Sequence, residues 1–258
     1  MSEVTPRSPF HQRTHRLIAS RFPTVGVFDD LTRDPDDLRA AFLLESITND
    51  RMSLPMQRVA RLPDDDIVTG PGATLVMAAF LHAGPAGGRF TNGDLGAWYA
   101  SCATETAIAE TVYHCDRRLR LSDGGFPASI QMRELLATVD AELIDLRGRQ
   151  DTRPDLYDRV DVRAAQAFGV SLRWPKDGPG ETGIVYDSVR RSGDTNVCIF
   201  RPSRVRLPVR QADHYEYRWD GLGDVSVFRL TRVTLTPGGS VRPDSRPSPR
   251  ADQSVPEK

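Results

Sequence analysis

Lysine is nearly absent from this chain, which has only Lys176 and Lys258, so arginine carries almost all of the positive charge. Lys and Arg together number 34 and Asp and Glu 35, for a formal net charge of −1. A nucleic-acid-binding protein normally carries a basic excess, so we expect no direct nucleic-acid binding. The arginine bias fits planar cations that match phosphate, but genomic base composition explains it equally well.

Cysteine is also scarce, with Cys102, Cys115 and Cys198 far apart and no Cys-x-x-Cys pair. This usage disfavours a zinc site or a secreted disulfide framework and is typical of reduced thiols. The five histidines show no metal-ligand spacing. The first residues do not resemble a signal peptide, and no apolar run approaches the roughly 20 residues that span a bilayer. We therefore expect a cytoplasmic protein with no metal and no membrane segment.

Three nucleotide or nucleophile motifs are missing. The chain has no Gly-x-x-x-x-Gly-Lys phosphate loop, no Gly-x-Gly-x-x-Gly after a strand and no Gly-x-Ser-x-Gly elbow. These absences disfavour a P-loop ATPase, a Rossmann dehydrogenase and a serine hydrolase of the α/β type.

The chain has 258 residues, of which 39% are hydrophobic and 27% charged, as in a soluble globular protein. Both ends lack hydrophobic periodicity. We expect residues 1–14 to be flexible, and residues 236–258, rich in Pro, Ser and charge, to be a disordered tail. No repeat or linker divides the interior, so residues 15–235 are predicted to form a single domain.

Helical and strand patterns alternate along the interior. The run at 73–82 is too short and too apolar for its period to decide, and we favour a strand there. The mixture lacks a regular βαβ rhythm, so we predict an α+β fold with a mixed sheet and flanking helices. The expected helices are 34–51, 104–120 and 163–173, and the expected strands are 73–82, 97–101, 129–135, 142–146, 183–189, 196–200 and 225–235.

The segment from 87 to 114 is the densest in chemically useful residues. Two glycines precede Arg89, a turn follows, and a short strand then carries Tyr99 directly into the 104–120 helix, capped by Thr104 or Ser101. We expect Tyr99 and Glu110 to lie beside one cavity. By helical spacing Glu110 shares a face with Thr106, Ala107, Tyr113 and His114, whereas Ile108, Val112 and Cys115 should face the core.

Each of these residues also has an ordinary explanation. A helical Glu is usually a solvated surface group, an Arg after Gly-Gly is usually a turn residue, and a strand Tyr usually packs. In the second dense segment, from 180 to 202, Ser188 ends a strand and is expected to donate a hydrogen bond into a pocket, or to satisfy its own turn.

Taken in order, these motifs resemble the RES family, named for Arg, Glu and Ser. The resemblance spans roughly residues 15–220, and residues 16–23 and 44–51 look like the longer subgroup of the family. It rests on Gly88-Arg89-Phe90, Tyr99-Ala100, Ala-x-x-Glu-x-x-x-His at 107–114, Gly-Ile-x-Tyr-x-Ser at 183–188, and the stretch 196–202.

The resemblance implies an ADP-ribosyltransferase-like fold and NAD+ as the substrate. Many family members are toxins neutralised by an Xre-type antitoxin, and the longer subgroup is associated with ADP-ribosylation of phosphoribosyl pyrophosphate synthetase. We therefore expect a toxin that cleaves the nicotinamide–ribose bond and transfers ADP-ribose to such a protein acceptor. The alternatives are an NAD+ glycohydrolase or phosphorylase that depletes NAD+, and a non-enzymatic module that binds a nucleotide or a partner.

The same resemblance assigns catalytic roles to Glu110, Arg89, Tyr99 and Ser188. Glu110 would stabilise the positive charge that develops on ribose C1′. Arg89 would bind the pyrophosphate through forked hydrogen bonds, Tyr99 would stack on the nicotinamide, and Ser188 would hold the nicotinamide ribose or amide.

Two further residues complete the expected NAD+ site. Arg16 would assist Arg89 at the pyrophosphate, because an Arg near the start of the domain is common in the family. His114, one turn after Glu110, would either orient that carboxylate or merely cover the helix.

Overall fold

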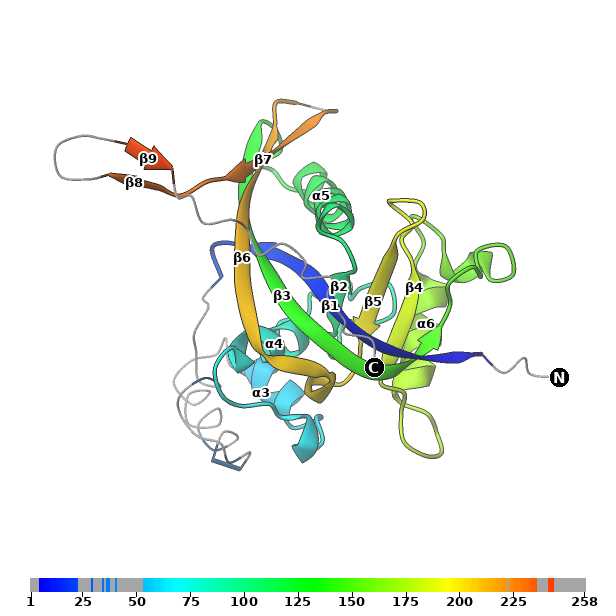
Figure 1. Ribbon diagram of the computed structural model, residues 1–258. Coiled ribbons are helices and arrows are strands. Elements are labelled where there is room, and N and C mark those ends of the chain that lie inside the picture. The colour runs from blue at the N-terminus through cyan, green and yellow to red at the C-terminus, as the bar shows by residue number, and fades with distance from the viewer. Residues whose placement is uncertain are drawn as a thin grey trace, which may run out of the picture.

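The structure is a computed structural model that describes residues 5–22, 29, 34, 36, 37, 40, 53–221, 223–235 and 241–243. Its centre is a mixed seven-stranded sheet in the order β1-β2-β5-β4-β3-β6-β7 (Figure 1). The strands are β1 (Arg7–Ala19), β2 (Trp98–Ser101), β3 (Ala128–Asp145), β4 (Gly183–Asp187), β5 (Thr195–Ile199), β6 (Val205–Trp219) and β7 (Val225–Leu230), and a separate hairpin joins β8 (Val233–Leu235) to β9 (Val241–Pro243).

The central strands close into a ring, because β1 pairs with β3 as well as with β2. Of the pairings in the sheet, β3–β4 is parallel and the others are antiparallel. The helices are α3 (Ser53–Val59), α4 (Ala73–Leu81), α5 (Thr104–Arg120) and α6 (Arg163–Arg173). A mixed sheet with flanking helices confirms the predicted α+β class.

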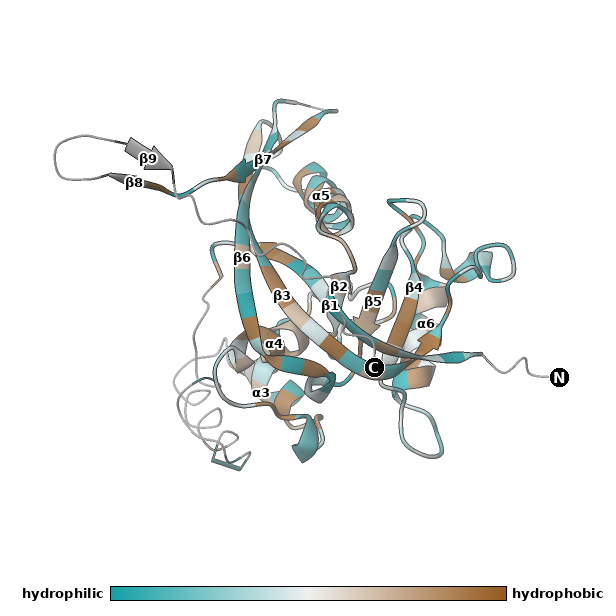
Figure 2. Cartoon of the chain, viewed as in Figure 1, coloured by the Kyte–Doolittle hydropathy of each residue, from teal (hydrophilic) through white to brown (hydrophobic). Residues whose placement is uncertain are grey.

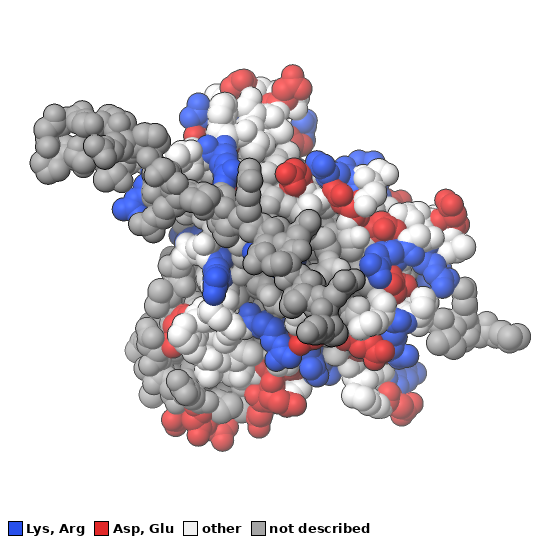
Figure 3. Space-filling model, viewed as in Figure 1, with Lys and Arg blue, Asp and Glu red and all other residues white. Residues whose placement is uncertain are grey.

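Three apolar clusters hold the helices against the strands. One joins α3 and α4 to the ring strands, the second lies under α6 and β4, and the third packs α5 against β1, β3 and β6. Figure 2 shows hydrophobic and polar residues alternating along β3 and β6, as expected of strands with one face buried. On the face seen in Figure 3, positive and negative side chains of the described residues are interspersed.

The segment predicted as a strand at 73–82 is instead the helix α4, so that prediction is wrong. Six of the nine residues of α4 are buried, among them Val76 and Phe80. A helix that is buried on all sides is apolar on all sides and shows no 3.6-residue period. The hydrophobic periodicity of residues 73–82 therefore could not distinguish a helix from a strand.

The prediction of a flexible segment at 1–14 is wrong for residues 7–14, which belong to β1. Their side chains are mostly exposed, so the pairing of β1 with β3 over thirteen residues orders them, rather than apolar burial. Strand β6 was not predicted, and it pairs with β3 over most of that strand. The strands predicted at 129–135 and 142–146 are parts of the one strand β3.

Three smaller differences concern segment ends. The strand expected at 225–235 is divided between β7 and β8, and the predicted tail contributes β9. The residue that caps α5 is Ala103, with no side-chain cap bond, rather than Thr104 or Ser101. The helix expected at 34–51 lies almost entirely outside the described residues, as do residues 1–4 and most of the tail.

None of the described helices is both long enough and apolar enough to cross a membrane. Within the same residues, no cluster of three or more His, Cys, Asp or Glu side chains is arranged to hold a metal ion.

A buried arginine at the end of α3 ties α4 to the loop that leads into β2. The Arg58 guanidinium donates hydrogen bonds to the carbonyl oxygens of Leu81, Ala83, Gly93 and Asp94, at 2.5, 3.0, 2.7 and 2.9 Å. Its replacement by Met leaves these four acceptors without their donors. We expect Arg58→Met to lower the free energy of unfolding by about 3 kcal/mol, measured by urea denaturation.

The matched control is Arg61→Met in the following turn, because Arg61 is exposed and forms a loose ion pair with Asp94 at 3.7 Å. An exposed pair of this kind contributes about 0–1 kcal/mol. Equal losses in the two variants would contradict the role given to Arg58.

Candidate active site

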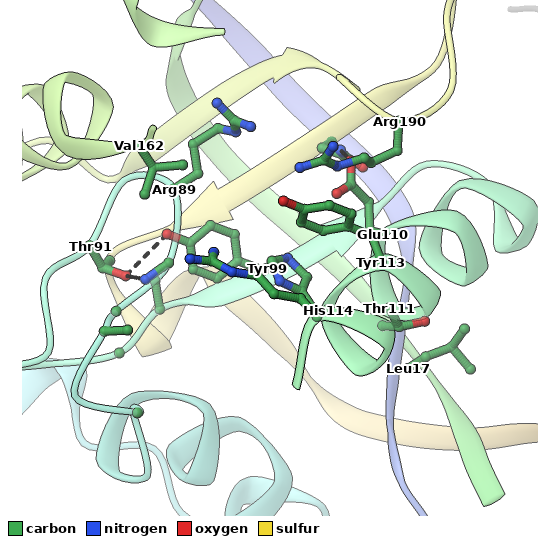
Figure 4. Close-up of a pocket in the computed structure, with 18 of the residues that line it drawn as sticks. Leu17, Arg89, Thr91, Tyr99, Glu110, Thr111, Tyr113, His114, Val162 and Arg190 are labelled. Carbon is green, nitrogen blue, oxygen red and sulfur yellow. Dashed lines mark hydrogen bonds between the residues drawn. The ribbon is translucent and has the colours of Figure 1, made fainter. Parts of the chain in front are cut away.

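A cavity of about 760 Å³ lies between α5, the 83–91 loop and the strands β1 and β2. This volume is within the range of sites for small molecules and cofactors. The structure brings five of the six predicted site residues to its wall, namely Arg16, Arg89, Tyr99, Glu110 and His114. Figure 4 labels the last four of them. The sixth, Ser188, is not one of the lining residues, but it donates a hydrogen bond to Glu110.

Glu110 is held through one of its two carboxylate oxygens. Its Oε1 atom accepts hydrogen bonds from Ser188 Oγ at 2.7 Å and from Asn196 Nδ2 at 2.8 Å. Ser188 Oγ in turn accepts from the backbone N–H groups of Arg190 and Arg191, both at 3.1 Å, so its single proton is directed at Glu110. Among the described residues nothing hydrogen-bonds Oε2, which leaves that oxygen available to a ligand.

Asn196 is a site residue to which the sequence analysis assigned no role. It lies opposite Ser101 in the β2–β5 ladder, and Ser101 Oγ donates to its side-chain carbonyl oxygen at 2.6 Å. That bond fixes the amide so that its NH₂ group points at Glu110. The contact depends on the register between two strands far apart in sequence, which no local pattern reveals.

Tyr99 is fixed by the loop that carries Arg89. The Tyr99 hydroxyl accepts from the Phe90 N–H at 2.9 Å and contacts Thr91 Oγ1 at 3.1 Å. Gly88 lies against the ring, and a Cβ atom at this position would come within 2.7 Å of it. Burial raises the pKa of Tyr99 well above its ordinary value, so the phenol stays neutral.

Arg16 lies next to Tyr99 on the adjoining strand. Its Nη1 donates to the Tyr99 carbonyl oxygen at 2.8 Å, and its guanidinium lies 5.1 Å from the centre of the Trp98 ring. Burial lowers the pKa of Arg16 to about 10, which still leaves it charged at neutral pH. The cation is therefore held at the cavity wall in a fixed position.

Arg89 anchors the loop that follows β3 and remains partly free. Its Nη1 donates to the carbonyl oxygens of Leu156 and Asp158 at 3.0 and 2.9 Å. Within the described part of the chain, its Nε and Nη2 atoms have no hydrogen-bond partner. Figure 4 shows Arg89 across the cavity from Arg190, with Glu110 on the side of Arg190.

Arg190 stacks on Tyr113, with its guanidinium carbon 3.3 Å from the ring centre. Arg190 Nη2 and the Tyr113 hydroxyl both donate to the Arg159 carbonyl oxygen, at 2.5 and 3.2 Å. Arg190 was not predicted as a site residue, whereas Tyr113 was placed on the same helix face as Glu110. The stack forms the cavity wall next to that carboxylate.

The lining of the cavity is strongly positive. Among the described residues that line it, the only carboxylate is that of Glu110. No described carboxylate forms an ion pair with any of the lining arginines, although arginines elsewhere are often ion-paired. Such a wall fits an anionic ligand. The lining arginines are Arg16, Arg89, Arg117, Arg118, Arg159 and Arg190.

His114 packs edge-on against Tyr113, with ring centres 5.4 Å apart, and makes no hydrogen bond to Glu110. Removal of water from part of its ring lowers the pKa of His114; Glu110 opposes this shift, and Arg190 adds to it. The ring is therefore neutral at neutral pH. The structure favours a packing position for His114 over direct orientation of Glu110.

A second polar cluster lies under the start of α5. His15 Nδ1 is 2.7 Å from Oε1 of the buried Glu134, and Thr104 Oγ1 donates to the same oxygen at 2.8 Å. Burial by itself raises the pKa of Glu134, but the hydrogen bonds from His15 and Thr104 outweigh it and the pKa is lowered. Glu134 is thus ionised at neutral pH.

This lowered pKa predicts a pH-dependent contribution to stability. A carboxyl with a lowered pKa in the folded state stabilises the protein above its unfolded value of 4.5, and loses that contribution as the pH falls further. We expect Glu134→Gln to be less stable than the parent at pH 7, with the difference shrinking below pH 4.5. Urea denaturation across this range measures it. The control is Glu142→Gln, at an exposed site of the same strand. A stability difference for Glu134→Gln that does not change with pH would contradict the lowered pKa of Glu134.

Two known proteins show similarity to this chain. The chain is 26% identical over 253 residues to y4oC, an uncharacterized protein of Sinorhizobium fredii (strain NGR234), an alignment that covers 95% of each protein. The crystal structure of the M. tuberculosis MbcT–MbcA toxin–antitoxin complex aligns with 81% of this chain and 86% of its own, at 12% identity and a TM-score of 0.41.

The family model of the RES domain matches residues 58–220, more than half of the chain. The match contains the loop with Arg89, the strand with Tyr99, the helix with Glu110, and both residues that hold Glu110. The chain therefore belongs to the RES domain family.

Proposed function

We propose that this protein cleaves the bond between nicotinamide and ribose in NAD+ and transfers ADP-ribose to a protein acceptor such as phosphoribosyl pyrophosphate synthetase. One observation carries the proposal. Among the described residues of a cavity lined by arginines, a single carboxylate, that of Glu110, is fixed through one oxygen and has no hydrogen bond at the other.

The charges of the cavity match those of the substrate. NAD+ has an anionic pyrophosphate and a cationic nicotinamide. The free N–H groups of Arg89 are suited to forked hydrogen bonds with the pyrophosphate, and Arg16 adds a second fixed cation near Tyr99. The cationic ring can then lie on the side of Glu110, the one carboxylate that the described wall residues supply.

Glu110 acts on the charge that develops during cleavage. As the C1′–N bond breaks, positive charge spreads over C1′ and the ring oxygen of the ribose. The Oε2 atom of Glu110 stabilises that charge and accepts a hydrogen bond from a ribose hydroxyl. The electron pair of the broken bond leaves with nicotinamide, which departs as a neutral molecule.

Ser188 and Asn196 contribute by positioning. Both donate to Glu110 Oε1, so the carboxylate needs little rearrangement during the reaction. Because the proton of Ser188 is directed at Glu110, we assign Ser188 to holding the carboxylate rather than to binding the nicotinamide ribose. In this proposal Tyr99, whose neutral ring is held through its hydroxyl, stacks on the nicotinamide.

The biological role in this proposal is that of a toxin, neutralised by an Xre-type antitoxin that covers the cavity. Membership of the RES family supports it. Because NAD+ must enter the cavity, a partner that blocks its mouth would stop the reaction without any change in the fold.

The test is incubation of the purified protein with NAD+, followed by chromatography of the products with and without phosphate and purified phosphoribosyl pyrophosphate synthetase. We expect free nicotinamide and ADP-ribose attached to the acceptor protein. Free ADP-ribose alone would make the protein a glycohydrolase, and ADP-ribose 1″-phosphate alone a phosphorylase. Binding of NAD+ with no nicotinamide release over hours would overturn the proposal and leave a nucleotide-binding module.

A further inference from the structure

Transfer of ADP-ribose to an O–H acceptor needs a general base. An acceptor O–H that attacks C1′ must lose its proton, and Glu110 is already committed to the positive charge on the ribose. Such a base must have a free proton-accepting atom on the cavity wall, within the length of one sugar ring from Glu110.

The sheet register places a histidine on the cavity wall, two strands from the residue that holds Glu110. In the closed ring of strands, His15 of β1 is opposite Ser101 of β2, and Ser101 is opposite Asn196 of β5. Residues opposite one another point to the same face of the sheet. All three residues line the cavity. Neighbouring strands lie about 4.8 Å apart, so the backbones at His15 and Asn196 are about 10 Å apart. Asn196 contacts Glu110 directly.

His15 also has the partner that a histidine base requires. Its Nδ1 lies 2.7 Å from Oε1 of Glu134, whose side chain is 4% exposed, and 3.0 Å from Thr104 Oγ1. A carboxylate at Nδ1 holds the proton on that nitrogen and leaves the lone pair on Nε2. No hydrogen bond to Nε2 is made by any residue that the structure describes, and the side chain is 22% exposed.

We propose that His15, oriented by Glu134, is the general base that removes the proton from the acceptor. This inference rests on the proposed function. As the acceptor oxygen forms its bond to C1′ and the C1′–N bond breaks, the acceptor proton moves to Nε2 of His15. The electron pair of the broken bond leaves with nicotinamide, and the proton on His15 later returns to solvent.

Among the described residues, one charged side chain contacts His15. The titratable group that contacts it is Glu134 on β3, while the residues that face it from α5 and β2, Thr104 and Ser101, carry no charge.

The experiment compares His15→Asn with the parent protein, using two small acceptors in place of the protein acceptor. Asn keeps a donor toward Glu134 but has no basic nitrogen. Methanol must lose a proton when it attacks, whereas azide is an anion and needs no base. We expect His15→Asn to lower the rate of methyl ADP-ribose formation by about 100-fold. The rate of ADP-ribosyl azide formation should stay within about 2-fold of the parent.

The matched control is His11→Asn, at an exposed position of the same strand where His11 pairs with Asp140. It should leave both rates unchanged. Equal losses with methanol and azide would assign His15 a merely structural role, and no loss with either would exclude it as the base. A parent protein that releases no nicotinamide would instead refute the proposed function itself.

Discussion

Glu110→Gln is expected to lower kcat for nicotinamide release by about 1,000-fold. The amide has nearly the same shape as the carboxylate, and its Oε1 can still accept from Ser188 and Asn196. The substitution therefore removes the negative charge proposed to act on C1′ while preserving the contacts that hold the side chain. Chromatographic measurement of nicotinamide over time gives the rate, and thermal unfolding checks that the variant is folded.

The matched control is Glu105→Gln, at an exposed position in the first turn of the same helix. It should keep full activity. Folded Glu110→Gln protein with more than about a tenth of the parental rate would show that the carboxylate does not supply the expected electrostatic stabilisation.

Arg89→Ala is expected to raise KM for NAD+ by about 100-fold, equivalent to about 2.7 kcal/mol of lost binding free energy, with a smaller effect on kcat. The substitution removes the N–H groups proposed to bind the pyrophosphate and also releases the carbonyl oxygens of Leu156 and Asp158. Steady-state kinetics over a wide range of NAD+ concentration separates the two parameters.

Two further variants show what Arg89 supplies. Arg89→Lys keeps the charge but loses the forked geometry, so its KM should fall between those of the parent and Arg89→Ala. Arg163→Ala removes an exposed arginine that pairs with Asp161 at the start of α6, and it should leave KM unchanged. An unchanged KM in Arg89→Ala would place the pyrophosphate elsewhere.

Local patterns predicted the elements that depend on local sequence. The helices α5 and α6 begin and end at the predicted residues, because each has one apolar face that repeats with helical spacing. The α5 face with Ile108, Val112 and Cys115 packs on the core, as predicted. In contrast, α4 is apolar on every side, and β1 is ordered mainly by pairing with β3. The hydrophobic periodicity of these two segments therefore did not indicate their secondary structure.

The site was predictable to a similar extent. Motif order indicated Arg89, Tyr99 and Glu110, and the structure places them around one cavity. Asn196 and His15 received no role, because each depends on which strands pair and in what register. A contact across β2 and β5, or across β1 and β3, joins residues about 95 to 119 positions apart, and no local spacing encodes it.

The most direct test of the account is a crystal structure of Glu110→Gln with NAD+ bound. We expect the dinucleotide inside the cavity, with the nicotinamide ribose against residue 110 and the pyrophosphate on Arg89. A dinucleotide bound outside this cavity, or inside it with C1′ far from residue 110, would contradict the central claim that these side chains act on one sugar.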